Sequence, residues 1–160
     1  MSIKISIVKN FSSSHFLIGH EKCGRIHGHN WKVKVIVEGE LEEHGWVMDF
    51  TVLKKVVDEL LNRYDHKMLL PNSISYNENG IKGNLNFIAN SKKYSFPKED
   101  CVIVPIDNIT CENLSILIYN ELKEILKNFT NIYGLEIIVN ERDEQGASFS
   151  GYFRDSKYSK

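Results

Sequence analysis

Three histidines near the start of the chain, His15, His27 and His29, have the spacing of a metal site. Side chains alternate between the two faces of a strand, so on a strand His27 and His29 would place both imidazoles on the same face. His15 ends a strand-like segment, and the loop Leu17–Gly24 is long enough to bring that strand back beside the His-x-His strand. The third imidazole would then join the pair. Three histidines with an open fourth position are typical of a catalytic zinc ion.

Cys23 lies four residues before His27 and leaves two interpretations open. It could complete a closed, structural zinc site with His27 and His29. Alternatively it could be a mobile thiol that acts as a base, because the neighbouring cations Lys22 and Arg25 would favour its thiolate form. A basic loop that contains glycine suits a mobile thiol better, and we therefore favour the second interpretation.

Two further positions narrow the kind of metal site. His20 lies in the same loop, but three histidines already suffice, so we expect it to be an exposed loop residue. A cupin-type site would require a glutamate four residues after the second histidine, and that position is Val33. The pattern therefore favours a site of three histidines over a cupin-type site.

Length and composition predict one globular domain, residues 1–160, with 42% hydrophobic and 26% charged residues. The net charge of −1 gives no overall field for nucleic acid or an anionic membrane, so we expect neither as a partner. Lys22 and Arg25 could instead bind a small phosphorylated substrate. Three cysteines, no secretory signal and no apolar run of membrane-spanning length predict a cytoplasmic protein.

The periodicity of apolar residues predicts four strands and two helices. Apolar and polar residues alternate over Ile3–Ser14 and His27–Val37, which we expect to pair as antiparallel strands. Two later strands, Leu135–Asn140 and Ser148–Phe153, should form a closing hairpin through Glu141–Gly146.

Apolar residues at intervals of three and four predict one helix capped by Asp49 and ending at Arg63–Tyr64. A second helix should begin after Asn108 or Thr110, either of which could cap it, and run to Leu126. Residues 72–104 between the helices carry turn signals and short strand-like runs. We predict that they form a hairpin or an ordered flap.

The run Cys-Gly-Arg-Ile-His-Gly-His over Cys23–His29, with His15 before it and Asp65-His66 after it, resembles the 6-pyruvoyltetrahydropterin synthase / 6-carboxytetrahydropterin synthase family. The resemblance covers residues 1–71 and 101–153, which makes residues 72–104 a predicted insertion. The combination is specific, although each motif alone is weak. Without the resemblance, Asp65-His66 would be read as a surface pair.

The resemblance implies a role for each of the candidate residues. It implies that zinc is bound by His15, His27 and His29, that Cys23 is a base, and that an aspartate and a histidine complete the catalytic set. It also implies that a glutamate and a threonine bind the pterin, although Ile109 replaces the proline with which the family's Pro-Thr-x-Glu-Asn pattern begins. The residues at these positions are Asp65, His66, Glu141 and Thr110.

The predicted fold class is α+β, an antiparallel four-stranded sheet with two helices on one face. The resemblance implies the tunnelling fold, in which three subunits join their sheet edges into a barrel and two trimers stack into a homohexamer. Active sites in that family lie between subunits. Pairing of edges is a physical answer to unpaired strand edges, but the sequence alone does not set the number of subunits.

The resemblance implies 7,8-dihydroneopterin triphosphate as the substrate. The compact run Cys23–His29 favours 6-carboxytetrahydropterin, acetaldehyde and triphosphate as products, as in deazaguanine and queuosine biosynthesis. Elimination of triphosphate to a 6-pyruvoyl product and cleavage to a hydroxymethyl pterin stay open. A zinc-containing pterin-binding protein without turnover and a metal-dependent hydrolase on an unrelated fold are the alternatives of other classes.

Overall fold

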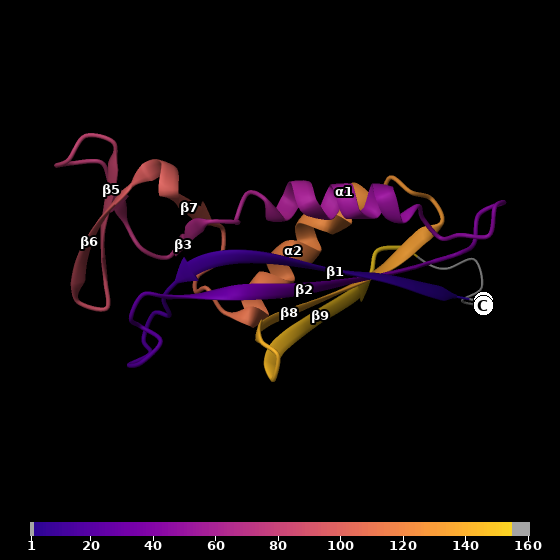
Figure 1. Cartoon of the computed structure of the whole chain (residues 1–160), viewed down its shortest axis with the longest axis horizontal. Helices are drawn as coiled ribbons and strands as arrows, with labels where there is room; N and C mark the ends of the chain where they lie inside the picture. Colours follow the sequence, from indigo (N-terminus) through magenta and orange to yellow (C-terminus); the bar gives the residue numbers. More distant parts are fainter. Residues whose placement is uncertain (1, 155–160) are drawn as a thin grey trace.

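The computed structural model describes residues 2–154, which fold around a six-stranded sheet (Figure 1). The predicted domain therefore extends at both ends to residues that lie outside the described part. The strand order is β7-β3-β1-β2-β8-β9. The bounds of these strands are β1 Ile3–His15, β2 His27–Gly39, β3 Lys67–Pro71, β7 Cys101–Val104, β8 Ile132–Arg142 and β9 Gln145–Tyr152.

Strands β1 and β2 form the long antiparallel pair that the alternation predicted. Their register runs from Ile3 opposite Gly39 to His15 opposite His27. Odd-numbered residues on both strands face the core, where Val33 and Val35 are fully buried. The histidines are odd-numbered as well, so all three belong to the face of the sheet that the helices cover.

The two helices, α1 (Phe50–Leu61) and α2 (Cys111–Leu126), cover one face of the sheet (Figure 1). Asp49 caps α1 as predicted, because its Oδ1 accepts a hydrogen bond of 2.7 Å from the Thr51 amide. Thr110, rather than Asn108, caps α2, since its hydroxyl accepts a hydrogen bond of 3.2 Å from the Asn113 amide. The first helix ends at Leu61, slightly before the predicted Arg63–Tyr64.

The prediction of a four-stranded, wholly antiparallel sheet was wrong. Strands β3 and β7 extend the sheet on the β1 side, and both pair in parallel. Each is five residues or shorter, and Leu69 and Leu70 of β3 are both fully buried. A short run that is buried on both faces carries no alternation, which is why the pattern did not identify it as a sheet strand.

The closing hairpin is longer and tighter than predicted. Strand β8 continues through Glu141 to Arg142, and β9 already begins at Gln145. The pairing is irregular between Asn140 and Arg142, where the register shifts. Glu141 therefore lies on a strand, at a bulge, rather than in a loop. The backbone of the sheet then sets the direction in which its side chain points.

Residues 72–104 contain a second, three-stranded sheet in the order β4-β5-β6, with β4 Tyr76–Asn77, β5 Asn84–Ala89 and β6 Lys92–Pro97. A short 3₁₀ helix, Lys98–Asp100, leads from it into β7. The sheet packs on its own apolar cluster, which includes Phe16, the residue after His15. Among the described residues, no helix combines the length and apolar character needed to cross a membrane.

Candidate active site

Three imidazoles converge where β1 ends and β2 begins. One ring nitrogen from each of His15, His27 and His29 lies within 4.8 Å of the other two. The ring centroids are 4.5 to 5.1 Å apart. The antiparallel register explains this, because it places His15 directly opposite His27, and the period of the strand places His29 beside them. The arrangement could hold a metal ion.

Hydrogen bonds to carbonyl groups set the tautomers of two of these rings. His15 Nδ1 donates to the carbonyl oxygen of Ile109 at 2.9 Å, and His27 Nδ1 donates to that of Arg25 at 2.7 Å. A carbonyl oxygen only accepts, so the proton is on Nδ1 and the lone pair is on Nε2. Such outer partners orient metal-binding histidines and fix the nitrogen that binds the ion.

The donor set fits a metal ion on its own chemistry. The Nε2 atoms of His15 and His29 are buried, and neither makes a hydrogen bond. Burial lowers the pKa of His15 to about 4, and burial likewise lowers the pKa of His29, so both rings are neutral at pH 7. Buried lone pairs without a partner are costly, and a bound cation would satisfy them. Cys23 is not part of this group of converging ligand atoms.

Cys23 lies in a loop that its own backbone folds into a compact turn. The Leu17 amide donates to the Cys23 carbonyl at 2.8 Å, and the Cys23 amide donates to His20 Nδ1 at 2.9 Å. His20 is an exposed loop residue, as predicted, and its ring accepts this bond within the loop. Lys22 and Arg25 are exposed, and neither lines the two cavities described below.

Asp65 and His66 are docked against β1 immediately before β3. Asp65 Oδ1 accepts a hydrogen bond of 2.8 Å from the Ser12 amide, and the His66 amide donates to the Ser12 carbonyl at 2.7 Å. Asp65 Oδ2 lies 2.7 Å from His66 Nδ1. The bond from Ser12, with that from His66, lowers the pKa of the Asp65 carboxyl group. His66 has a φ of 58°, and its side chain is 82% exposed.

This geometry makes Asp65 and His66 an oriented pair. An ionised carboxylate bonded to Nδ1 leaves Nε2 of the exposed ring free to exchange a proton. A positive φ is uncommon outside glycine and persists only where surrounding contacts hold it, here the bonds to Ser12. The strained backbone thus directs the His66 ring into solvent at the start of β3.

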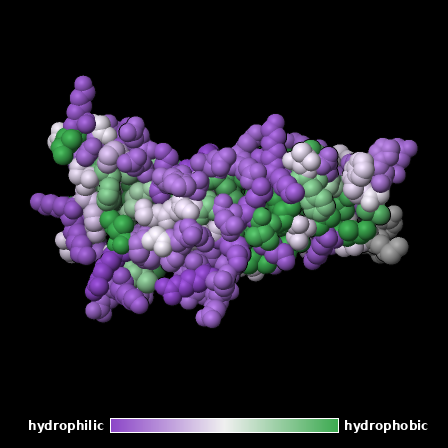
Figure 2. Space-filling model, viewed as in Figure 1, coloured by the Kyte–Doolittle hydropathy of each residue, from purple (hydrophilic) through white to green (hydrophobic). Residues whose placement is uncertain are grey.

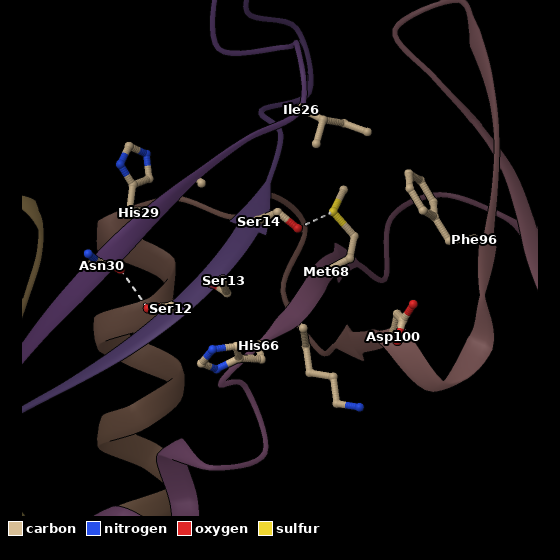
Figure 3. Close-up of a pocket in the computed structure, with 12 residues that line it drawn as sticks. Ser12, Ser13, Ser14, Ile26, His29, Asn30, His66, Met68, Phe96 and Asp100 are labelled. Atoms are coloured by element: carbon tan, nitrogen blue, oxygen red, sulfur yellow. Dashed lines mark hydrogen bonds between the residues drawn. The ribbon is translucent and has the colours of Figure 1, made fainter.

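Two cavities meet at the β1–β2 pair and link the candidate residues. The first, of about 590 Å³, is lined by His66 and by Phe96 and Asp100 from residues 72–104 (Figure 3). The second, of about 640 Å³, is lined by Asp65 and Glu141. In Figure 3, His29 is on β2, and His66, which directly precedes β3, lies across the β1–β2 pair from it. Residues that line both cavities are Ser12, Gly28, His29 and Asn30.

Glu141 lies beside the histidines. Its Oε2 is 3.5 Å from His29 Nε2, and its Oε1 accepts a hydrogen bond from the Gln145 side chain. Thr110 is at the N-terminus of α2, next to Ile109, whose carbonyl group orients His15. Thr110 lines neither cavity, and its capping bond leaves the hydroxyl proton available to donate.

A family model described as 6-pyruvoyl tetrahydropterin synthase matches residues 4–152. The chain belongs to this family. A putative 6-carboxy-5,6,7,8-tetrahydropterin synthase from Methanocaldococcus jannaschii is 39% identical over 146 residues, which is 89% of this chain and 90% of that protein. The dihydroneopterin monophosphate aldolase of Pyrococcus furiosus is 39% identical over 69 residues, or 43% of this chain and 59% of that protein.

Solved structures of the 6-pyruvoyl tetrahydropterin synthase family have the same fold. The structure of 6-pyruvoyl tetrahydropterin synthase from Plasmodium falciparum superposes with a TM-score of 0.84 at 30% identity. The superposition covers 95% of this chain and 99% of that chain. Residues 72–104, including the small sheet, must therefore lie largely within the aligned region.

Several residues that organise this tetrahydropterin synthase site were not found from the sequence. Ile109 contributes a backbone carbonyl, for which a sequence pattern carries no signal. Asn90 and Asn108 bond the backbone of the Cys23 loop from two directions. Asn90 was not singled out from the sequence, because only the fold brings it beside a loop some seventy positions earlier in the chain.

Proposed function

We propose that this tetrahydropterin synthase-type lyase depends on zinc and converts 7,8-dihydroneopterin triphosphate and one water molecule to 6-carboxy-5,6,7,8-tetrahydropterin, acetaldehyde and triphosphate. The observation that carries the proposal is the convergence of three imidazoles, two of them with buried Nε2 atoms that make no hydrogen bond. Glu141, 3.5 Å from His29, and a cavity that is lined by both His29 and His66 support it. The compact run Cys23–His29 and the Methanocaldococcus relative support the carboxy product.

Bound zinc would supply Lewis acidity toward the oxygens of the substrate side chain, which makes neighbouring protons easier to remove. Cys23 would take such a proton as a thiolate. Lys22 and Arg25 would bind the triphosphate. Asp65 would hold the His66 ring in one tautomer, so that Nε2 moves a proton at the other side of the substrate.

Glu141 would fix the pterin ring. An ionised carboxylate offers two acceptor oxygens, which match the paired N–H donors on the amino-pyrimidine edge of a pterin. Gln145 already donates to Oε1, and this bond holds the carboxylate in place beside His29. The free hydroxyl proton of Thr110, at the adjoining helix terminus, would donate to the same ring.

Identification of the products tests the proposal. The purified, zinc-loaded chain is incubated with 7,8-dihydroneopterin triphosphate, and the products are analysed by mass spectrometry. The carboxy product together with acetaldehyde and triphosphate supports the proposal. Triphosphate with an intact three-carbon side chain would show a 6-pyruvoyl product instead. Ligand-induced stabilisation without turnover would show a pterin-binding protein.

Aldol-type cleavage is the second candidate, and the partial match to the Pyrococcus furiosus aldolase is the observation that favours it. Cleavage of the side chain would leave a hydroxymethyl pterin and keep the phosphate on the released fragment. The same experiment separates the two, because that reaction gives neither acetaldehyde nor free triphosphate.

Replacing Glu141 with alanine should raise KM roughly 10- to 100-fold and change kcat little. Hydrogen bonds to a charged group contribute about 1.5–3 kcal/mol, and here they would stabilise the bound substrate and the transition state equally. Steady-state kinetics measure both constants. Glu144→Ala is the matched control, since Glu144 is an exposed glutamate in the turn of the same hairpin. An unchanged KM in Glu141→Ala would mean that the pterin binds elsewhere.

His66→Ala and Asp65→Asn should instead lower kcat by roughly 10²- to 10⁴-fold, the range typical of a lost acid–base group, with little change in KM. The asparagine keeps the bond to Ser12 but no longer stabilises a charged imidazole ring. Asp58→Asn, which removes an ion pair on α1, serves as the control and should leave kcat unchanged. Equal kcat in wild type and His66→Ala would remove His66 from the mechanism.

We also propose that copies of the chain assemble into the homohexamer that the family resemblance implies. Strands β7 and β9 are the two edges of the main sheet. Figure 2 shows apolar surface toward the end of the molecule where β2 leads into α1. There a groove of about 520 Å³ is lined by Leu41, Trp46 and Phe50, each close to half exposed. Light scattering of the purified chain measures the number of subunits.

A further inference from the structure

Asn90 connects the small sheet to the loop that carries Cys23. It is the first residue of the two-residue turn between β5 and β6, and it has a φ of 48°. Its Nδ2 donates to the carbonyl oxygens of Leu17 at 3.0 Å and Gly24 at 3.1 Å. Its Oδ1 accepts a hydrogen bond of 3.1 Å from the Gly19 amide. One amide side chain thus makes three bonds to the backbone of the loop.

The three bonds fall on both sides of Cys23. Leu17 and Gly19 precede it, and Gly24 follows it directly. Gly24 is buried, and a Cβ atom there would lie 2.2 Å from the His20 carbonyl oxygen and 2.9 Å from Asn90 Nδ2. The loop backbone at Gly24 therefore lies too close to His20 and Asn90 for any larger residue, directly beside Cys23.

Apolar packing holds the β5–β6 hairpin against the end of β1. Ala89, next to Asn90, is buried in the apolar cluster with Phe87 and Phe16. Phe16 stacks on Phe87 and on Tyr94 from the facing strand, with ring centroids 6.0 Å apart in both cases. Because Phe16 directly follows His15, this packing ties the hairpin to the strand that carries a candidate metal ligand.

We propose that the β5–β6 hairpin positions Cys23 through Asn90, whose side chain fixes the backbone on both sides of the thiol. The inference rests on the proposed role of Cys23 as the base. A base must lie within hydrogen-bond reach of the proton that it removes, and a displacement of about 1 Å can cost roughly 100-fold in rate. Asn90 is therefore a positioning residue, and residues 72–104 take part in catalysis through it.

Asn108 also bonds the loop, but its bonds serve another part of the site. It exchanges two bonds with the backbone of Ile18, at 2.9 and 3.2 Å. Its neighbour Ile109 orients His15, so changes at Asn108 would disturb the metal ligands. The hydrogen bonds of the Asn90 side chain go to Leu17, Gly19 and Gly24 and to none of the three histidines. Gly24 precedes Arg25, whose carbonyl group orients His27, so metal content is measured together with the effect on Cys23.

The test compares Asn90→Gly with Ser91→Gly in the full-length, zinc-loaded chain. Glycine tolerates the positive φ at both positions, 48° and 62°, so each substitution keeps the turn. Only the first removes an amide that bonds the loop. A third variant, Asn90→Asp, keeps the acceptor for Gly19 but directs a carboxylate at the carbonyl oxygens of Leu17 and Gly24.

Three quantities are measured for each variant: kcat and KM, metal content, and the rate at which iodoacetamide alkylates Cys23, followed by peptide mass spectrometry. For Asn90→Gly we expect kcat to fall roughly 10- to 100-fold, with KM within about threefold of wild type. The alkylation rate should rise about threefold or more as the thiol is released, and metal content should not change. Asn90→Asp should behave in the same way, and Ser91→Gly should match wild type.

Two outcomes would overturn the inference. If kcat falls as far in Ser91→Gly as in Asn90→Gly, the fall is caused by a change in the turn and not by the lost bonds. If Asn90→Gly has the kcat and the Cys23 alkylation rate of the wild type, the bonds do not position the thiol. The alkylation assay needs no substrate. If the wild type does not turn over the pterin, the proposed function fails, and the alkylation contrast alone then decides whether Asn90 holds the Cys23 loop.

Discussion

Replacing Cys23 with alanine should leave one metal ion per chain in place and lower turnover by roughly 10²- to 10⁴-fold, the contribution typical of a general base. The metal should stay because the converging ligand atoms belong to His15, His27 and His29. The bonds that Cys23 makes within its loop come from its backbone, which the alanine keeps. Turnover should fall because no other thiol lies in that loop.

Elemental analysis of the purified variant and the rate of triphosphate release check the two halves of this prediction. Cys101→Ala is the control, because Cys101 is a free, partly buried thiol on β7 and not part of that loop. Burial raises the pKa of the Cys101 thiol, which disfavours the thiolate form. Loss of metal from Cys23→Ala would favour the closed cysteine–histidine site, and retained turnover would exclude the thiol as the base.

The alternation of apolar residues was enough to predict the centre of the fold. It identified the strand pair β1–β2, and the register of that pair is what brings His15 opposite His27. Caps and apolar intervals identified both helices, with Asp49 at the start of the first. These signals are local, so they can be read from neighbouring positions in the chain.

The parallel strands and the supports of the site could not be predicted in this way. Strand β3 is short and buried, and its partners β1 and β7 are distant in sequence. The Ile109 carbonyl reaches His15 across 94 positions, and Asn90 reaches Leu17 across 73. Such contacts depend on tertiary packing, for which no local pattern exists.

His15→Ala and His27→Ala should lose metal to the same extent but differ in the stability of the metal-free chain. Loss of a residue that only hydrogen-bonds a metal ligand lowers metal affinity roughly 10- to 100-fold. Loss of either histidine, itself a ligand, should lower it by more. His15 is only 1% exposed, and alanine there would leave a cavity and an unpaired Ile109 carbonyl group. We expect this to reduce the free energy of unfolding by about 2–4 kcal/mol.

His27 is only partly buried, so His27→Ala should change the free energy of unfolding of the metal-free chain by less than about 1 kcal/mol. Urea denaturation in the presence of a chelator measures both variants, and elemental analysis measures their metal content. Because metal binding adds to the stability of the folded state, zinc should stabilise the wild type and neither variant. Full metal content in either variant would contradict the three-histidine site, whereas equal stability of the two metal-free variants would contradict only the structural role of His15.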